Sequence, residues 1–265
     1  FIGLGVLGSA MAENLVNSGF TVIGYDTVAE KRAALEEGGG QSGTSPKDVA
    51  DRSDVVILCL PTADVLHAVA DKLKDGGGEG QIILEVSTFA IADKEKARDT
   101  LAEAGKILLD CPVSGNRILA LKKQLTAFGS GDRAAYDSVE HIIQGFADRT
   151  FHVGEFGCGM KMKFCGNILN LVHNSVAAEV MVLGMKAGLE PELIHQVISG
   201  SGSSSMNLGF FASLPSNSTR VIWLRNARFC SSFKPCFLVP ARPLTSLRAS
   251  VWAMNTRPLE STARP

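Results

Sequence analysis

The chain opens with Phe1-Ile2-Gly3-Leu4-Gly5-Val6-Leu7-Gly8, the end of an apolar strand that runs directly into a G-x-G-x-x-G turn. Gly3 permits the tight turn, Gly5 lets the backbone approach a pyrophosphate, and Gly8 lets helix and strand pack closely. An amphipathic helix follows, and the N–H groups at its N-terminus favour bound phosphates. The residues predicted to bind a dinucleotide cofactor in this turn are Gly3, Leu4, Gly5, Val6, Leu7 and Gly8.

A second apolar strand ends at Asp26, where a carboxylate can accept hydrogen bonds from the ribose hydroxyls of adenosine. Strand, turn, helix, strand and acid in this order predict a dinucleotide-binding fold; the competing interpretation is a glycine-rich connector. Asp26 would repel a 2′-phosphate, which favours NAD over NADP. Lys31 and Arg32 either attract that phosphate or are solvated charges at the start of the next helix, so NADP stays open.

Length and charge limit the classes of protein to which the chain can belong. The 265 residues suffice for a large core and two domains, and the net charge is −1. No apolar run reaches the ~18 residues that a membrane span needs, so no membrane partner is expected. Six scattered cysteines without a C-x-x-C pair indicate a reduced, intracellular and cytoplasmic protein. Because Phe1 already lies in a strand, a preceding segment such as a mitochondrial leader stays open.

Strand-like and helix-like segments alternate through the first part of the chain and predict an α/β fold, a doubly wound parallel sheet of the Rossmann type. Strands are expected at 21–25, 54–61, 81–88, 107–113, 125–129 and 150–153, and helices at 29–37, from 45, at 63–74, 92–104 and 134–144. A long helix to residue 188 and a shorter one at 190–198 follow. The predicted domains are a Rossmann domain over 1–155, the start of a truncated all-helical domain over 156–206, and an atypical tail over 207–265.

Lys163 and Asn167 lie four residues apart and therefore share one face near the start of the long helix. Desolvation and the positive end of the helix dipole both disfavour a charged lysine there. A pKa lowered toward about 7–8 would make Lys163 a general base. The competing interpretation is an exposed lysine beside Lys161, but the dinucleotide fold favours the catalytic one.

Two loops at the carboxyl ends of strands could meet ligands. Ser114 and Gly115 offer a hydroxyl and N–H groups suited to a substrate carboxylate, or else form a simple turn. Ser87 and Thr88 either face the nicotinamide or merely end a strand. The five histidines form no cluster with ligand spacing, so no metal site is expected.

These motifs, in this order, resemble the β-hydroxyacid dehydrogenase family over residues 1 to about 206. The family includes 3-hydroxyisobutyrate dehydrogenase and, more distantly, 6-phosphogluconate dehydrogenase. The matching segments are residues 1–15, Leu60-Pro61, Ser87-Thr88, Asp110 to Gly115, and Gly157-x-Gly159-x-x-x-Lys163-x-x-x-Asn167. Residues 172–189 are similar to the L-threonate dehydrogenase branch in particular.

The resemblance implies hydride transfer between NAD(P) and a small hydroxyacid or semialdehyde, with Lys163 as general acid and base. It implies that Asn167 holds the substrate hydroxyl or carbonyl and that Ser114 and Gly115 bind its carboxylate. Leu60, Pro61 and Thr88 would contact the cofactor. Asn116 stands where the family has a second glycine, in the same substrate loop.

Residues 207–265 depart from the family, whose later helices carry a Lys-Asp pair. This stretch has no Asp, both tryptophans, six of the ten prolines and eight basic residues against one acid. The break in composition predicts an irregular or frame-shifted tail rather than a nucleic-acid-binding arm, since the basic residues are dispersed. The family implies a homo-oligomer, which this tail would disturb. The alternative functions are an inactive dinucleotide-binding relative or truncated product, and an NADPH-linked semialdehyde reductase.

Overall fold

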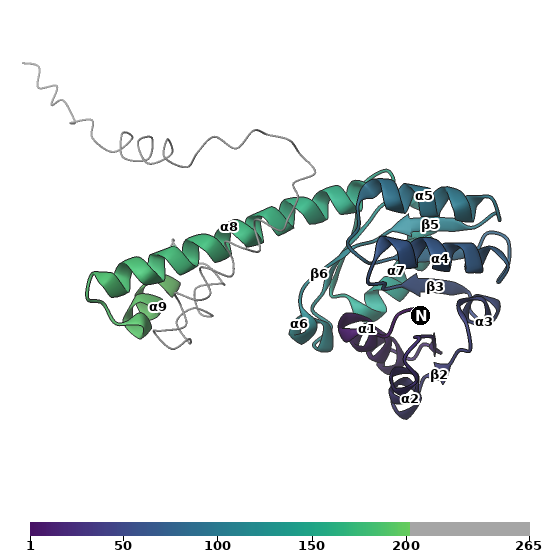
Figure 1. Ribbon diagram of the computed structural model, residues 1–265, viewed down its shortest axis with the longest axis horizontal. Helices are drawn as coiled ribbons and strands as arrows, with labels where there is room; N and C mark the ends of the chain where they lie inside the picture. The colour runs from purple at the N-terminus through teal and green to yellow at the C-terminus, as the bar shows by residue number, and fades with distance from the viewer. Residues whose placement is uncertain (202–265) are drawn as a thin grey trace, which may run out of the picture. The chain divides into compact units, whose positions relative to one another are not determined.

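The computed structural model describes residues 1–201 and separates into two compact units, Phe1–His173 and a second unit that begins at Asn174. The predicted tail, residues 207–265, lies outside the described residues. Nearly all the regular structure lies in the first unit, where strands and helices alternate as the sequence predicts (Figure 1). The predicted division at residue 155 stays a prediction.

Parallel strands form the centre of the first unit. The strands β3 (Val55–Leu58), β4 (Ile82–Glu85) and β5 (Ile107–Asp110) pair in parallel, as do β1 (Ile23–Gly24) and β2 (Gln41–Ser42). Ile2 forms parallel bridges to both Tyr25 and Leu58, so the opening segment lies between β1 and β3. The strand order reverses beside this segment, which is where nucleotide-binding α/β sheets place their ligands. The predicted parallel fold is confirmed.

Alternate side chains of each central strand enter different hydrophobic cores, because successive residues of a strand point to opposite faces. Ile57, Leu84 and Leu109 join one core, with helices α1 (Val6–Asn17) and α7 (Arg133–Phe146). The intervening strand residues join the second core, with α3 (Pro46–Asp51), α4 (Ala63–Lys74) and α5 (Ile91–Ala102). Helix α2 (Ala29–Glu37) packs beside β2. Burial on both faces explains why these strands read as continuous apolar runs.

The strand predicted over residues 107–113 is two strands. β5 ends at Asp110, and after Pro112 a separate β6 (Val113–Ser114) pairs antiparallel with β7 (Thr126–Gly129), which pairs in parallel with β8 (Arg149–His152). Proline has no N–H to donate to a ladder, so it interrupts the run. The short helix α6 (Arg117–Leu121), which the sequence analysis did not predict, follows β6.

Helix α8 (Cys158–Lys186) begins in the first unit and ends in the second. In the second unit it packs on α9 (Pro191–Ser199) through Ala177, Met181 and Ile194. By length and composition alone α8 is apolar enough to cross a membrane, which the search for uninterrupted apolar runs did not detect. Long core helices of soluble proteins meet the same criterion, so the expectation of no membrane partner stays a prediction.

Candidate active site

The glycine turn opens onto a cavity of ≈ 420 Å³. The predicted cofactor residues that line it are Gly3, Gly5, Val6, Leu7, Asp26, Leu60 and Pro61. Within residues 1–201 no side chain caps the N-terminus of α1, so its first N–H groups are available to an anion. Gly5 leaves open space where a Cβ would stand. These features fit a dinucleotide diphosphate.

Three predicted cofactor residues do not line this cavity. Leu4 is buried in the core beneath it, and its N–H donates to Asp26. Gly8 packs against the Gly3 carbonyl, so its role is close packing of the helix on the turn. Thr88 is exposed after β4. Direct contact of these three with a cofactor stays a prediction.

The second and third glycines of the turn should respond differently to alanine. A Cβ at Gly5 meets no heavy atom within 4 Å and the backbone φ is −68°, so we expect Gly5→Ala to fold normally. Its methyl group would occupy the path of the diphosphate and weaken NADH binding by about tenfold, or 1.4 kcal/mol. A Cβ at Gly8 would overlap the Gly3 carbonyl, so Gly8→Ala should lower stability by about 1–3 kcal/mol.

Thermal unfolding and titration of NADH fluorescence measure the two effects separately. Each variant serves as the control for the other, because both add one methyl group to the same turn. Normal NADH affinity in Gly5→Ala would show that the diphosphate does not pass over this residue.

Asp26 is held in place by donors from both flanking segments. Its Oδ2 accepts from the Leu4 N–H at 2.9 Å, and its Oδ1 accepts from the Val28 N–H at 3.0 Å. The Lys31 Nζ lies 3.4 Å from Oδ2, and Arg32 donates to the Asp26 carbonyl. Burial alone would raise the pKa of Asp26, but the two N–H donors and Lys31 together hold it below its ordinary value. Asp26 therefore remains a carboxylate.

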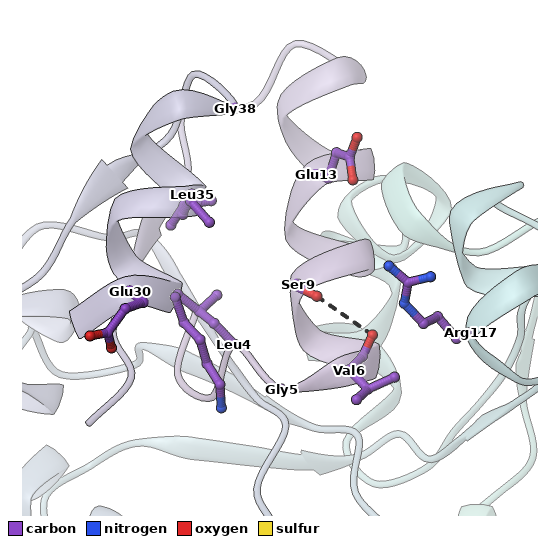
Figure 2. Close-up of a pocket in the computed structure, with 11 residues that line it drawn as sticks. Leu4, Gly5, Val6, Ser9, Glu13, Glu30, Leu35, Gly38 and Arg117 are labelled. Atoms are coloured by element: carbon purple, nitrogen blue, oxygen red, sulfur yellow. Dashed lines mark hydrogen bonds between the residues drawn. The ribbon is translucent and has the colours of Figure 1, made fainter. Parts of the chain in front are cut away.

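A second hollow, of ≈ 570 Å³, lies between α1 and α2 and shares Gly5, Val6 and Lys31 with the first (Figure 2). Figure 2 shows Arg117 reaching from α6 toward the first turn of α1, near Val6. Among residues 1–201 the guanidinium of Arg117 has no hydrogen-bond or ion-pair partner. No motif in the sequence marks this cation, although it directly follows the predicted substrate loop.

Lys163 lies on α8 in the first unit and is partly buried. Burial lowers the pKa of its ammonium group below the ordinary 10.5, as the sequence analysis expected from desolvation. Asn167 lies one turn further along the same helix and is also partly buried. The general-base assignment itself stays a prediction.

The predicted substrate loop follows β6. Ser114 is partly buried and Gly115 is exposed, with a φ of +140° that favours glycine. The Oδ1 of Asn116 accepts from the Leu119 N–H at 3.0 Å and so caps α6. Asn116 therefore has a structural task beside any contact with substrate.

A buried ionic cluster, not found by sequence reasoning, lies at the ends of β4 and β5. The Nζ of Lys94 on α5 lies 2.6 Å from Glu85 Oε2 and 2.7 Å from Asp110 Oδ1, and all three side chains are fully buried. The one sequence signal was that Lys94 falls on the apolar stripe of α5 with Ala97 and Leu101. Charges so deeply buried need their partners.

Two family models match the chain. Residues 1–154 match the NAD binding domain of 6-phosphogluconate dehydrogenase, and residues 157–219 match a domain described as NAD-binding of NADP-dependent 3-hydroxyisobutyrate dehydrogenase. The cofactor class is therefore NAD(P), as predicted.

Individual relatives agree with these matches. L-threonate dehydrogenase of Cupriavidus necator is 31% identical over 77% of this chain and 70% of its own length. NAD-dependent L-serine dehydrogenase of Pseudomonas aeruginosa is 31% identical over 81% and 73%, respectively. The solved structure of Mycobacterium tuberculosis 3-hydroxyisobutyrate dehydrogenase with L-serine superposes with a TM-score of 0.76 at 24% identity, over 96% of this chain and 91% of that one. That structure supports the fold.

Proposed function

Because the chain belongs to the β-hydroxyacid dehydrogenase family of NAD(P)-dependent oxidoreductases, we propose that it oxidises a small β-hydroxyacid with Lys163 as the general base. NAD is the proposed cofactor, and the reverse reaction reduces the matching semialdehyde. The observation that carries the proposal is the partly buried amine of Lys163, whose pKa is lowered by desolvation, in a unit that also holds the glycine-turn cavity.

Oxidation of a hydroxyacid removes a hydride from the carbinol carbon and a proton from its hydroxyl group. The nicotinamide, when bound, accepts that hydride. Neutral Lys163 takes the hydroxyl proton and, in reduction, returns it to the carbonyl oxygen. A lowered pKa supports this role, because more of the amine is neutral near pH 7 than in an exposed lysine.

The surrounding residues have proposed binding roles. Asn167 orients the reacting oxygen, while Ser114, Gly115 and Asn116 hold the substrate carboxylate. Thr88 contacts the cofactor near the reacting ring. Arg117 lies near the start of α1 and has no ion-pair partner within the described part of the chain, so it is proposed to bind an anionic group of the cofactor there.

We expect the protein to bind NAD more tightly than NADP, because Asp26 would repel a 2′-phosphate. Asp26→Asn removes that charge and frees Lys31 to pair with the phosphate. The ratio of the two affinities should shift toward NADP by about tenfold, which corresponds to 1.4 kcal/mol. Fluorescence titrations with NADH and NADPH measure the ratio, and Glu36→Gln, an exposed acid later in α2, is the control. An unchanged ratio in Asp26→Asn would contradict the assignment of Asp26 to the ribose.

The substrate class is tested by assaying threonate, 3-hydroxyisobutyrate, glycerate, serine and succinic semialdehyde with both cofactors. Three of these compounds are the named substrates or bound ligands of matched relatives. Turnover of at least one supports the proposal. NADH binding without turnover of any would favour the alternative, an inactive dinucleotide-binding relative.

A homo-oligomer is also proposed. Apolar side chains that are more than half exposed recur along α8, and large exposed apolar surfaces mark interfaces. They are Ile168, Leu169, Val172, Val176 and Leu183. Light scattering after size-exclusion chromatography would give the mass in solution.

A further inference from the structure

The buried cluster of Lys94, Glu85 and Asp110 reaches the helix that carries Lys163. Asp110 Oδ2 accepts from the Met160 N–H at 2.9 Å, within the first turn of α8. Asp110 Oδ2 also accepts from the Ser130 hydroxyl at 3.0 Å, and the Ser130 Oγ accepts from the Gly159 N–H at 2.9 Å. Two of the N–H groups that a helix start leaves unpaired therefore end on one buried carboxylate and its hydroxyl partner.

Close approach of the helix to this carboxylate depends on Gly159. A Cβ at that position would lie 2.3 Å from the carbonyl oxygen of Phe128 on β7 and 2.9 Å from both the carbonyl oxygen and Oδ2 of Asp110, closer than real side chains come. The first turn of α8 therefore rests directly on the end of β5. Lys163 follows Met160 by three residues, which is about 4.5 Å along the helix axis. The position of Met160 therefore largely determines the position of Lys163.

A second set of contacts links the same cluster to the loops that flank the cofactor cavity. Glu85 Oε1 accepts from the Ser87 N–H at 2.8 Å, and the Ser87 Oγ accepts from the Leu60 N–H at 2.8 Å. Leu60 lines the cavity of the glycine turn. Lys94 thus joins two carboxylates, one of which contacts the helix of Lys163 and the other the loop beside the cofactor.

We propose that Asp110, paired with Lys94, is the positioning residue that fixes the start of α8 and thereby sets where the Lys163 amine meets the substrate. This inference rests on the proposed function. Asp110 contacts no reacting atom and acts through the backbone of α8. A carboxylate is a strong acceptor for the N–H groups at a helix start, and the Lys94 ammonium pairs with this one at 2.7 Å in a fully buried place.

The test compares Asp110→Asn with Glu85→Gln. Both variants replace one buried carboxylate on Lys94 with an amide of the same size, but only Asp110 contacts α8. We expect Asp110→Asn to lower kcat by about 10- to 100-fold, because misplacement of a reacting group by about 1 Å costs up to about 10²-fold. NADH affinity should stay within about twofold, a change of under 0.5 kcal/mol. Glu85→Gln should keep kcat within about threefold of the wild-type value.

Two further readouts separate positioning from general loss of structure. With a hydroxyacid deuterated at its carbinol carbon, the isotope effect on kcat for oxidation should rise in Asp110→Asn, because the chemical step becomes slower than product release. Hydrogen exchange of the Gly159 and Met160 amides should accelerate in Asp110→Asn and not in Glu85→Gln. If Asp110→Asn does not fold, Ser130→Ala removes the acceptor of the Gly159 N–H and should show the same pattern with a smaller loss of kcat.

The outcomes distinguish this inference from the proposed function. Equal losses of kcat in Asp110→Asn and Glu85→Gln, or unchanged exchange at the start of α8, would overturn the positioning role while the wild type still turns over. If the wild type oxidises none of the hydroxyacids, the proposed function fails, and the exchange rates alone decide whether Asp110 holds the helix.

Discussion

Lys163→Ala should lower kcat for hydroxyacid oxidation by about 10²- to 10⁴-fold, the usual contribution of a positioned general base. In the proposed mechanism the amine takes the hydroxyl proton as the hydride leaves, and alanine cannot. NADH affinity should be unchanged, because Lys163 does not line the glycine-turn cavity. Initial rates at saturating substrate and fluorescence titration with NADH measure the two quantities.

Lys161→Ala is the matched control, since Lys161 lies two residues earlier on the same helix and is exposed. It should turn over at the wild-type rate. Because the base must be neutral, the wild-type rate of oxidation should rise with pH through the pKa of Lys163. Burial lowers that pKa, so the midpoint of the rise should lie below the ordinary lysine value of 10.5. If Lys163→Ala turns over at the wild-type rate, Lys163 is not the general base.

Lys94→Met should lower the free energy of unfolding by about 3–5 kcal/mol at neutral pH, the cost of removing one partner from a buried ionic cluster. Methionine fills similar space, but it leaves Glu85 and Asp110 buried together without a cation. Urea unfolding followed by circular dichroism measures the change. Lys96→Met, an exposed lysine on the same helix, should lie within about 0.5 kcal/mol of the wild type.

The deficit of Lys94→Met should depend on pH. Burial raises the pKa of Glu85 in the folded protein, and Lys94 opposes that rise, so the pKa goes higher still when Lys94 is absent. An acid with a raised folded pKa contributes most to stability below its unfolded pKa, and this contribution is lost as pH rises through the folded pKa. The deficit should therefore be smallest near pH about 5 and grow toward pH about 8. A deficit that stays constant across this range would show that lost packing, not charge, is responsible.

Much of the fold could be predicted because its determinants are local. Helices α2 and α4 have the predicted bounds, 29–37 and 63–74, and each has a local signal at one end: Gly38 follows α2, and the Thr62 side chain accepts from the Val65 N–H at the start of α4. The glycine turn and Asp26 could also be predicted from the sequence, because their spacing along the chain reflects the geometry of one strand–helix–strand unit. These features place the cofactor cavity without knowledge of any distant contact.

The buried cluster could not be predicted, because its members come from three separate elements. Glu85 and Asp110 each end a strand, and only the parallel register that pairs Glu85 with Asp110 brings the two carboxyl groups together. A lysine in a helix reads as a solvated charge unless the opposing surface is known. The antiparallel β6 was missed for a related reason, since its partner β7 lies beyond α6.

The direct contact of α8 with the end of β5 affects any attempt to transfer the proposed catalytic lysine into another scaffold. Transfer of Lys163 and Asn167 alone would leave out the residues that hold the start of α8 in place. The smallest transferable set also includes Asp110, Ser130 and Lys94, together with a glycine at position 159. Asp110, Ser130 and Lys94 contact one another or a shared partner, so the effects of substituting them are not additive. A library that changes them together therefore samples functional combinations that single substitutions miss.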